Sequence, residues 1–345
     1  MYPWSLWDET GMKRWQFWLG AGISALLLWL ALRGLRLEEV WAEMQGAAYL
    51  WLVPGVAVYF LAVWARAWRW HYLLRPLKQI STRVAFPIVC IGYMGNNIYP
   101  ARAGEVLRSY VLRRKEAVPM SASLATIAVE RSFDGIVMLA FIVFNLPELA
   151  RATADAGLVG DIRSVAVVGA VVFLLAVVVF AVLAALPQRA EAILNRIPLP
   201  CSIRPQAAGL ASRFLDGLAS LRSPKDVFMV LLSSVVIWLL ETGKYWFVMQ
   251  AFPFEVSFFA LMLMNGIVNL ATTLPSAPGY IGTFDAPGIA VLAAYGVPKA
   301  LATAYTLVLH AALWLPITLV GAYYMTRESI HWSAVQAEVA QEAVR

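Results

Sequence analysis

MGNNIYPARAGEVLR, residues 94–108, and LPSAPGYIGTFDA, residues 274–286, interrupt apolar sequence in the same way. Each contains a proline followed four residues later by a glycine, as Pro100–Gly104 and Pro275–Gly279, and each has an acidic residue just beyond. Proline removes a helix hydrogen bond, and glycine admits conformations closed to other residues. The two stretches therefore predict a pair of apolar segments, each divided into two arms, with charged groups beside the division.

The composition indicates a polytopic membrane protein. The 345 residues are 61% hydrophobic and 14% charged, and the mean hydropathy is +0.69. A soluble domain of this size needs more polar surface. We interpret the net charge of +6 as a topology signal, and we expect no nucleic-acid partner. With two cysteines and three scattered histidines, the sequence predicts no disulfide framework, no metal site and no cofactor.

Apolar runs long enough to cross about 30 Å of hydrocarbon recur along the chain. They predict an all-α protein with about six full spans, at 15–33, 48–67, 120–146, 163–187, 226–250 and 299–326. Two further stretches, 84–116 and 256–297, each begin with an apolar arm and break at the proline–glycine pair. We expect a single transmembrane domain over 15–326, preceded by an interfacial segment 1–14 and followed by a cytoplasmic tail 327–345.

Loop charges indicate how the two broken stretches are inserted. The net charge is +5 for 66–83, +3 for 101–119 and +4 for 188–225, and it is −2 for both 34–48 and 147–162. Positive loops favour the cytoplasmic side. If 66–83 and 101–119 share that side, the stretch between them enters the membrane and returns as a re-entrant hairpin.

The same reasoning places the second broken stretch on the opposite face. Span 226–250 exits and the basic end near Arg327 returns inside, so 256–297 dips in from the outside. Each break is also followed by a similar helix start, VPMSASLAT at 118–126 and VPKALAT at 297–303. The pattern predicts an inverted repeat, with units at about 84–146 and 256–326, unless the match reflects only common helix-start chemistry.

Charged residues inside the predicted spans mark the protein interior. Glu130, Arg131 and Asp134 lie within one span, and Glu241 and Lys244 within another. A charge at the bilayer centre costs roughly 2.5–3.5 kcal/mol on insertion scales, so we expect these side chains to face other helices. Two interpretations stay open: an ion-pair network that holds helices together, and a polar pocket for a substrate.

In the pocket interpretation, Arg102, Arg108 and Arg131 contact a phosphate, because the guanidinium fork donates two parallel hydrogen bonds. Glu105 and Glu130 orient those arginines or accept a cationic headgroup. Asn96 and Asn97 are further candidates as neutral donors, and Asp285 is the acidic counterpart to Glu105 in the second broken stretch. His310 is a lone imidazole that is either a satisfied buried group or a proton-linked one.

Four motifs, NNIYPARAGEVLR, VERSFDG, LPSAPGYIGTFDA and ALATAYTLVLH, resemble the membrane domain of lysylphosphatidylglycerol synthase/flippase proteins and related flippase-like proteins. The resemblance covers about 15–326. It implies transfer of a lipid headgroup between leaflets, either an aminoacylated phospholipid or a polyprenyl-linked glycan. The polar core that it implies consists of Asn97, Arg102, Glu105, Arg108, Glu130, Arg131, Asp134, Pro278, Gly279 and Asp285.

The chain departs from that family in two respects. The family often has arginine where His310 stands and glutamate where Asp285 stands. The soluble aminoacyl-transferase domain of the two-part synthases is absent, so we expect no lipid aminoacylation.

The leading hypothesis is therefore a flippase that moves a phospholipid or polyprenyl-linked headgroup through a central cavity. We expect no enzymatic activity. The alternatives are an integral-membrane lipid-modifying enzyme and a scaffold for envelope or hopanoid lipid synthesis, which would bring lipid-synthesis enzymes as partners. We expect a multi-pass protein of a bacterial cytoplasmic (inner) membrane with both termini cytoplasmic. The sequence sets no oligomeric state.

Overall fold

The computed structural model describes residues 14–99, 102–153, 156–188 and 204–330, and the regular elements in these ranges are all helical. In chain order the α-helices are α1 Arg14–Leu32, α2 Leu37–Gln45, α3 Leu52–Leu74, α4 Thr82–Ile98, α5 Ala103–Glu116, α6 Met120–Ala152, α7 Ala156–Ala185, α9 Arg204–Gly217, α10 Pro224–Met249, α11 Phe258–Ala271, α12 Asp285–Ala294 and α13 Lys299–Arg327. Of the predicted terminal segments, 1–13 and 331–345 lie outside the described residues.

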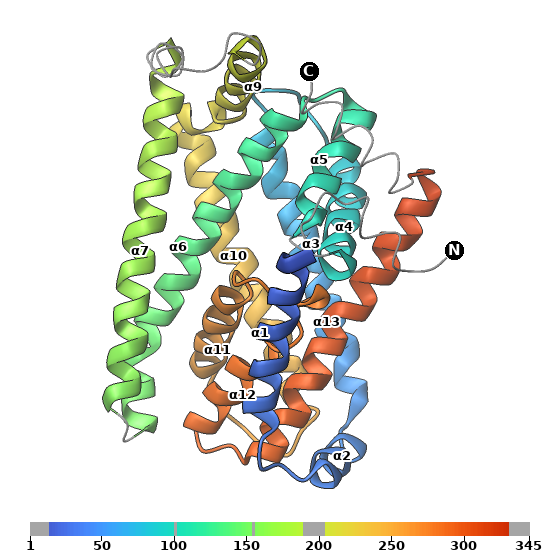
Figure 1. Cartoon of the computed structure of the whole chain (residues 1–345), viewed down its shortest axis with the longest axis vertical. Helices are drawn as coiled ribbons and strands as arrows, with labels where there is room; N and C mark the ends of the chain where they lie inside the picture. Colours follow the sequence, from blue (N-terminus) through green and yellow to red (C-terminus); the bar gives the residue numbers. More distant parts are fainter. Residues whose placement is uncertain (1–13, 100–101, 154–155, 189–203, 331–345) are drawn as a thin grey trace.

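The helices divide by length and by position along the long axis of the molecule. Long helices α3, α6, α7, α10 and α13 run along most of that axis (Figure 1). Helices α4 and α5 lie in its upper half, and α11 and α12 lie in its lower half, each pair in mutual contact. We call α4–α5 the first helical pair and α11–α12 the second helical pair.

The described residues contain fewer candidate spans than the six that the sequence predicts. Four helical stretches are long and apolar enough to cross a membrane: Tyr49–Leu74, Gly160–Ala185, Pro224–Met249 and Lys299–Arg327. A fifth is counted only if Trp18–Leu32 and Leu37–Gln45, bent by 84°, form one span. The chain is thus a multi-pass membrane protein, and the part that the structure describes contains four or five candidate spans.

The predicted span at 120–146 illustrates why the counts differ. Helix α6 is a single 33-residue helix, which corresponds to about 50 Å at 1.5 Å per residue. It is absent from the candidate spans, and the charged residues Glu130, Arg131 and Asp134 fall inside it. Length alone would allow it to cross a bilayer, and its charges require partners in the protein.

Both predicted chain breaks are confirmed. The first separates α4 from α5, which begins at Ala103 and is preceded by Arg102 in the left-handed region at φ 55°. The second separates α11 from α12 and contains the short 3₁₀ turn η4, Pro278–Tyr280, in which Gly279 has φ 75°. The two breaks therefore share a left-handed backbone, although different residue types adopt it.

Gly104 differs from Gly279 in what it does for its break. It lies inside the first turn of α5, and a Cβ there would approach the Gly92 carbonyl oxygen of α4 to 1.9 Å. Gly104 itself is not left-handed, since Arg102 takes that role in the first break. Gly104 is the reason that α4 and α5 pack in direct contact.

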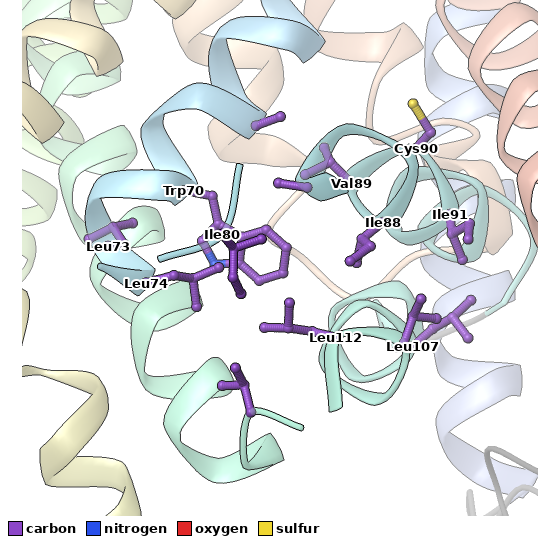
Figure 2. Packing of buried hydrophobic residues seen from close by; sticks show 14 of the residues in the cluster. Trp70, Leu73, Leu74, Ile80, Ile88, Val89, Cys90, Ile91, Leu107 and Leu112 are labelled. Atoms are coloured by element: carbon purple, nitrogen blue, oxygen red, sulfur yellow. The ribbon is translucent and has the colours of Figure 1, made fainter. Parts of the chain in front are cut away.

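Each helical pair is attached to the long helices by its own apolar cluster. In Figure 2 the Trp70 ring of α3 lies beside Leu74 and Ile80 and faces Leu112 of α5, and Ile88 of α4 belongs to the same buried cluster. A second buried apolar cluster joins α10, α11, α12 and α13, and it contains Tyr245, Met264, Leu292 and Tyr305. The two clusters hold the pairs at opposite ends of the molecule.

Helix α7 is attached differently. Of its described side chains only Ala184 is buried, and valines and leucines are exposed along its length. Its main neighbour is α6. Phe173 of α7 fills the space that a side chain at Gly135 of α6 would occupy, because a Cβ at Gly135 would lie 2.5 Å from the Phe173 ring. We call the gap at Gly135 that the Phe173 ring fills the notch, and shape complementarity at the notch positions α7.

We expect Gly104→Ala to destabilise the protein, because the added Cβ cannot fit without moving α4 away from α5. Overpacking of this kind costs about 1–3 kcal/mol. Gly209→Ala in α9 is the matched control, since nothing lies within 4 Å of a Cβ at Gly209. The measurement is thermal unfolding of purified protein by tryptophan fluorescence. Equal midpoints for the two variants would contradict the close packing of the first helical pair.

Candidate functional site

A polar cavity of about 130 Å³ lies between the two chain breaks. The break residues Arg102 and Tyr280 line it, together with Asn97 at the end of α4 and Thr272 just after α11. Helices α3, α6, α10 and α13 complete the wall. The cavity is therefore bounded by both helical pairs and by the long helices that hold them.

The charged groups that line the cavity are mostly cationic. Four described cations, Arg66, Arg102, Arg131 and Lys244, face one described carboxylate, that of Glu241. Arg66 binds Glu241 at 2.9 Å, and Lys244 contacts the other oxygen of the same carboxylate. Carboxylates behind the lining offset part of this charge, because Glu105, Glu130 and Asp134 lie 3.6, 2.9 and 3.8 Å from Arg131. The side chains that line the cavity still carry more positive than negative charge, which favours an anion.

The structure brings the sequence-predicted site residues together in two shells. Eight of them line the cavity: Asn96, Asn97, Arg102, Arg131, Glu241, Lys244, Gly279 and His310. The other six are Glu105, Arg108, Glu130, Asp134, Pro278 and Asp285. Of these, Glu105 lies 3.6 Å from Arg131, and Asp285 lies 2.8 Å from His310. Glu130 and Asp134 also lie within 4 Å of Arg131, so the carboxylates of the second group hold cavity-lining side chains in position.

Arg108 is the predicted phosphate ligand that the structure places away from the cavity. It is buried, its guanidinium donates two hydrogen bonds to Glu130 at 3.0 and 3.3 Å, and it stacks on Trp70 at 3.6 Å. A guanidinium engaged on both its edge and its face has a structural role in this conformation.

Two arginines of the site were assigned by sequence to a basic cytoplasmic loop. Arg66 and Arg69 lie within α3, which continues to Leu74, and both are buried. The predicted loop 66–83 therefore loses two of its five positive charges, although it stays basic. A signal was present: the two arginines are three residues apart on a tryptophan-rich apolar segment, so they share one face of a helix.

Arg69 connects α3 to α6 and α10. It is fully buried and binds Asp134 at 2.5 Å and Glu130 at 3.1 Å. It also donates a hydrogen bond to the Ser234 hydroxyl at 2.7 Å, and Trp238 donates to the same Asp134 oxygen at 3.0 Å. A buried charge is tolerated only when it is paired and hydrogen-bonded in this way.

The two chain breaks contact each other across the cavity. Arg102 donates a hydrogen bond to the Thr272 carbonyl at 3.1 Å and lies 5.9 Å from the Tyr280 ring centroid. Asn97 donates to the Thr318 hydroxyl at 2.9 Å, while Trp314 donates to the Asn97 carbonyl at 3.4 Å. Residues about 170 positions apart in the sequence thus meet at one point.

The second break has its own histidine–aspartate pair. The His310 ring places Nδ1 at 2.8 Å from the Asp285 carboxylate and Nε2 at 2.7 Å from the Gly279 carbonyl oxygen. The second carboxylate oxygen of Asp285 accepts a hydrogen bond from the Gly282 amide at 2.9 Å. Within the described residues, no group of three or more His, Cys, Asp or Glu side chains could hold a metal ion.

Taken together, helices with buried ion pairs around a cationic cavity define a multi-pass membrane protein with a polar interior. The chain belongs to the family described as lysylphosphatidylglycerol synthase TM region, whose model matches residues 17–321. This confirms the resemblance that the four sequence motifs indicate.

The chain is similar to several archaeal proteins. It is 28% identical to glycosyltransferase AglD of Haloferax volcanii, over 87% of this chain and 53% of that protein, so it spans about half the length of this relative. It is 23% identical to a UPF0104 membrane protein of Methanothermobacter thermautotrophicus, over 88% and 89% of the two chains. It is 25% identical to one of Pyrococcus horikoshii, over 88% and 93%. No solved structure matches the chain.

We expect Arg69→Met to destabilise the protein strongly, because it leaves Asp134 and Glu130 short of a buried cation. Removing one partner of a buried pair costs about 3–5 kcal/mol. Unfolding of the purified protein is the measurement. Arg36→Met is the control, since the Arg36–Glu39 pair is exposed and should contribute less than about 1 kcal/mol. An Arg69→Met variant as stable as the control would show that the buried network is dispensable.

Proposed function

We propose that this protein is a lipid flippase that transfers a lipid with a phosphate-containing headgroup between leaflets, with the headgroup in the cationic cavity. The observation that carries the proposal is the position of the cavity: it lies between two chain breaks and is lined by four described cations against one described carboxylate. Transporters commonly bind substrate where discontinuous helices meet near the bilayer midplane.

In this proposal the two helical pairs are re-entrant hairpins of an inverted repeat. Their positions in opposite halves of the molecule support it (Figure 1). The helices that follow them also begin alike, because Pro119 and Pro298 are the N-caps of α6 and α13. Non-helical backbone at membrane depth is tolerated where it lines a wet cavity. The breaks beside the polar cavity satisfy that condition.

The arginines supply the recognition of phosphate. Arg102 and Arg131 line the cavity, and their side chains are 32% and 31% exposed. Each guanidinium carries five N–H donors, and donors that face the cavity can bind phosphate oxygens in pairs. Lys244 adds a third positive charge to the same wall.

An apolar groove provides a place for the hydrocarbon chain of such a lipid. It has a volume of about 490 Å³ and lies between α6, α7 and α11. Near the end of α11, Asn269 and Thr272 line the charged cavity, whereas Leu270 and Leu274 line the groove. The same short segment thus borders a polar and an apolar space. This arrangement suits a molecule with a charged head and a long apolar tail.

We further propose that both termini are cytoplasmic, in the cell's cytoplasmic membrane. Arg75 and Lys78, which follow α3, and Arg113, Arg114 and Lys115, at the end of α5, support a cytoplasmic orientation for the upper end in Figure 1. The relatives described above are archaeal. The assignment to a bacterial membrane therefore stays a prediction from the sequence.

The second candidate is a lipid-modifying enzyme, and one observation favours it: the name of the haloarchaeal relative is glycosyltransferase. That name describes a protein of which this chain covers 53%. A scaffold that holds lipid-synthesis enzymes is the third. Incubation of purified protein with radiolabelled lipid and sugar donors separates the first two, because a flippase moves the lipid unchanged and an enzyme yields a new labelled product.

We expect Arg102→Ala and Arg131→Gln to slow lipid transfer by about 10-fold or more, which corresponds to about 1.5–3 kcal/mol for a hydrogen bond to a charged group. The assay uses vesicles of phosphatidylcholine and phosphatidylglycerol with NBD-labelled phosphatidylglycerol, whose outer-leaflet fraction is quenched by dithionite.

Arg36→Gln is the control, because Arg36 is exposed and far in sequence from the cavity lining. Unfolding temperatures of all three variants exclude general loss of structure. If both cavity variants transfer NBD-lipid at the control rate, the cavity is not the translocation site.

A further inference from the structure

The Asp285–His310 pair at the second break has a hydrogen-bond pattern that fixes a proton count. His310 Nε2 lies 2.7 Å from the Gly279 carbonyl oxygen, and Nδ1 lies 2.8 Å from an Asp285 oxygen. Both partners of the ring are oxygen atoms. A carbonyl oxygen accepts only, so Nε2 carries a hydrogen.

The Nδ1 contact then requires one more hydrogen. If the imidazole is neutral with its hydrogen on Nε2, Nδ1 is an acceptor, and Asp285 must supply a proton as a carboxylic acid. If the imidazole is an imidazolium, Nδ1 donates to a carboxylate. Both descriptions contain the same number of protons, which is one more than a neutral histidine beside an ionised aspartate. Two hydrogen bonds from the ring to oxygen atoms therefore require the proton-loaded form of the pair.

The location of the pair gives that proton a route and a consequence. The His310 side chain is 14% exposed and lines the cavity, whereas Asp285 is 2% exposed. A proton entering from the cavity thus reaches the histidine first. The histidine holds the Gly279 carbonyl, and Gly279 lies in the break at φ 75°. Protonation and the shape of the second break are connected through one hydrogen bond.

The charges that face the pair are distributed unevenly. Within the pair, Asp285 is the acidic group that contacts the His310 ring. Tyr280 of η4 lines the same polar cavity as His310. Across the cavity stand the cations Arg66, Arg102, Arg131 and Lys244 and the carboxylate of Glu241. The side chains of α1 that the structure describes, at 18–32, and Asn97 of α4 add no charge, and α1 packs against α12. An anionic headgroup in the cavity would therefore offset the charge of the surrounding cations.

We propose that Asp285 and His310 form a proton-binding site whose loading closes the second break and whose release opens it, coupling lipid transfer to a proton gradient. This inference rests on the proposed flippase function. On release, the proton leaves to water in the cavity, and neutral His310 and the Asp285 carboxylate remain. Neutral His310 then has one ring hydrogen for two oxygen partners. With the hydrogen on Nε2, the Nδ1 lone pair faces the Asp285 carboxylate, and with the hydrogen on Nδ1, the Nε2 lone pair faces the Gly279 carbonyl oxygen. In either tautomer one contact becomes repulsive, so the ring separates from Asp285 or from Gly279.

The proton site is tested without any transport assay. The protein is labelled with ¹⁵N-histidine in nanodiscs, and ring nitrogen shifts are recorded between pH 5 and pH 9. We expect the His310 signals to show a hydrogen on Nε2 and a strongly hydrogen-bonded Nδ1 at low pH, and to change in one step as the proton is lost. A neutral His310 with a free Nδ1 at every pH, or signals that never change, would overturn the proposal.

Asp285→Asn is the informative variant. The asparagine amide donates to Nδ1 and its oxygen accepts from the Gly282 amide, so every hydrogen bond is satisfied with no added proton. We expect His310 to stay neutral across the whole range in this variant. His71→Asn is the matched control, because the His71 ring contacts the Ile80 carbonyl oxygen in a different part of the chain. The control should retain the wild-type behaviour of His310.

Coupling is tested in the NBD-lipid vesicles with an imposed gradient of two pH units in either direction. We expect the ratio of transfer rates under the two gradients to differ from one by several-fold in the wild type and in His71→Asn, and to be close to one in Asp285→Asn. A wild-type ratio of one with intact transfer refutes coupling and leaves the flippase. If wild-type vesicles transfer no NBD-lipid, the flippase proposal and its coupling both fail, while the nitrogen shifts still decide whether the proton site exists.

Discussion

The carboxylate of Glu130 is the point at which three helices of the protein are tied together. It is fully buried in α6 and binds Arg69 of α3, Arg108 of α5 and its own neighbour Arg131 at 3.1, 3.0 and 2.9 Å. In an apolar medium such a cluster persists only if each member keeps its partners. The consequence is positional. Arg108 is directed away from the cavity, the first helical pair is held to α3 and α6, and Arg131 is turned so that its guanidinium reaches both Glu130 and the cavity wall. The arrangement of the site follows from the need to neutralise one carboxylate.

The sequence was most informative where local chemistry dominates. Pro100–Gly104 and Pro275–Gly279 predict chain breaks because proline and glycine act on their own backbone, and the structure has both breaks. It was less informative where the decision depends on distant partners. Arg66 and Arg69 look like the start of a basic loop, and only contact with Glu241 and Asp134 shows that α3 continues through them. Likewise, the charges of α6 identify an interior helix. Which of Arg108 and Arg131 faces the cavity depends on the Trp70 ring, and Trp70 is 38 residues away from Arg108 in the sequence.

The two breaks also show how similar sequence patterns reach different backbones. In the first, the glycine lies inside a helix and permits contact with α4, while Arg102 adopts the left-handed conformation. In the second, Gly279 and Tyr280 are both left-handed, and a histidine from α13 holds the Gly279 carbonyl. A left-handed conformation at a residue other than glycine stores roughly 1–3 kcal/mol of strain. Arg102 and Tyr280 both adopt this left-handed conformation, and they face each other. The strained residues are therefore also residues through which the two breaks meet.

The notch between Phe173 and Gly135 determines how firmly α7 is held. Lipid tails are as apolar as the valines of this helix, so the membrane offers α7 no net gain from packing on protein in preference to lipid. The contacts that retain it include the fit of the Phe173 ring against Gly135, the packing of Leu139 of α6 against Gly169, and a hydrogen bond from Arg222 to the Ala184 carbonyl at 2.6 Å. Because α7 forms one side of the apolar groove, a small sideways displacement of this single helix changes the width of that groove. The wall of the groove that presents most apolar surface to the bilayer is thus also the wall that loses least free energy when it moves into the bilayer.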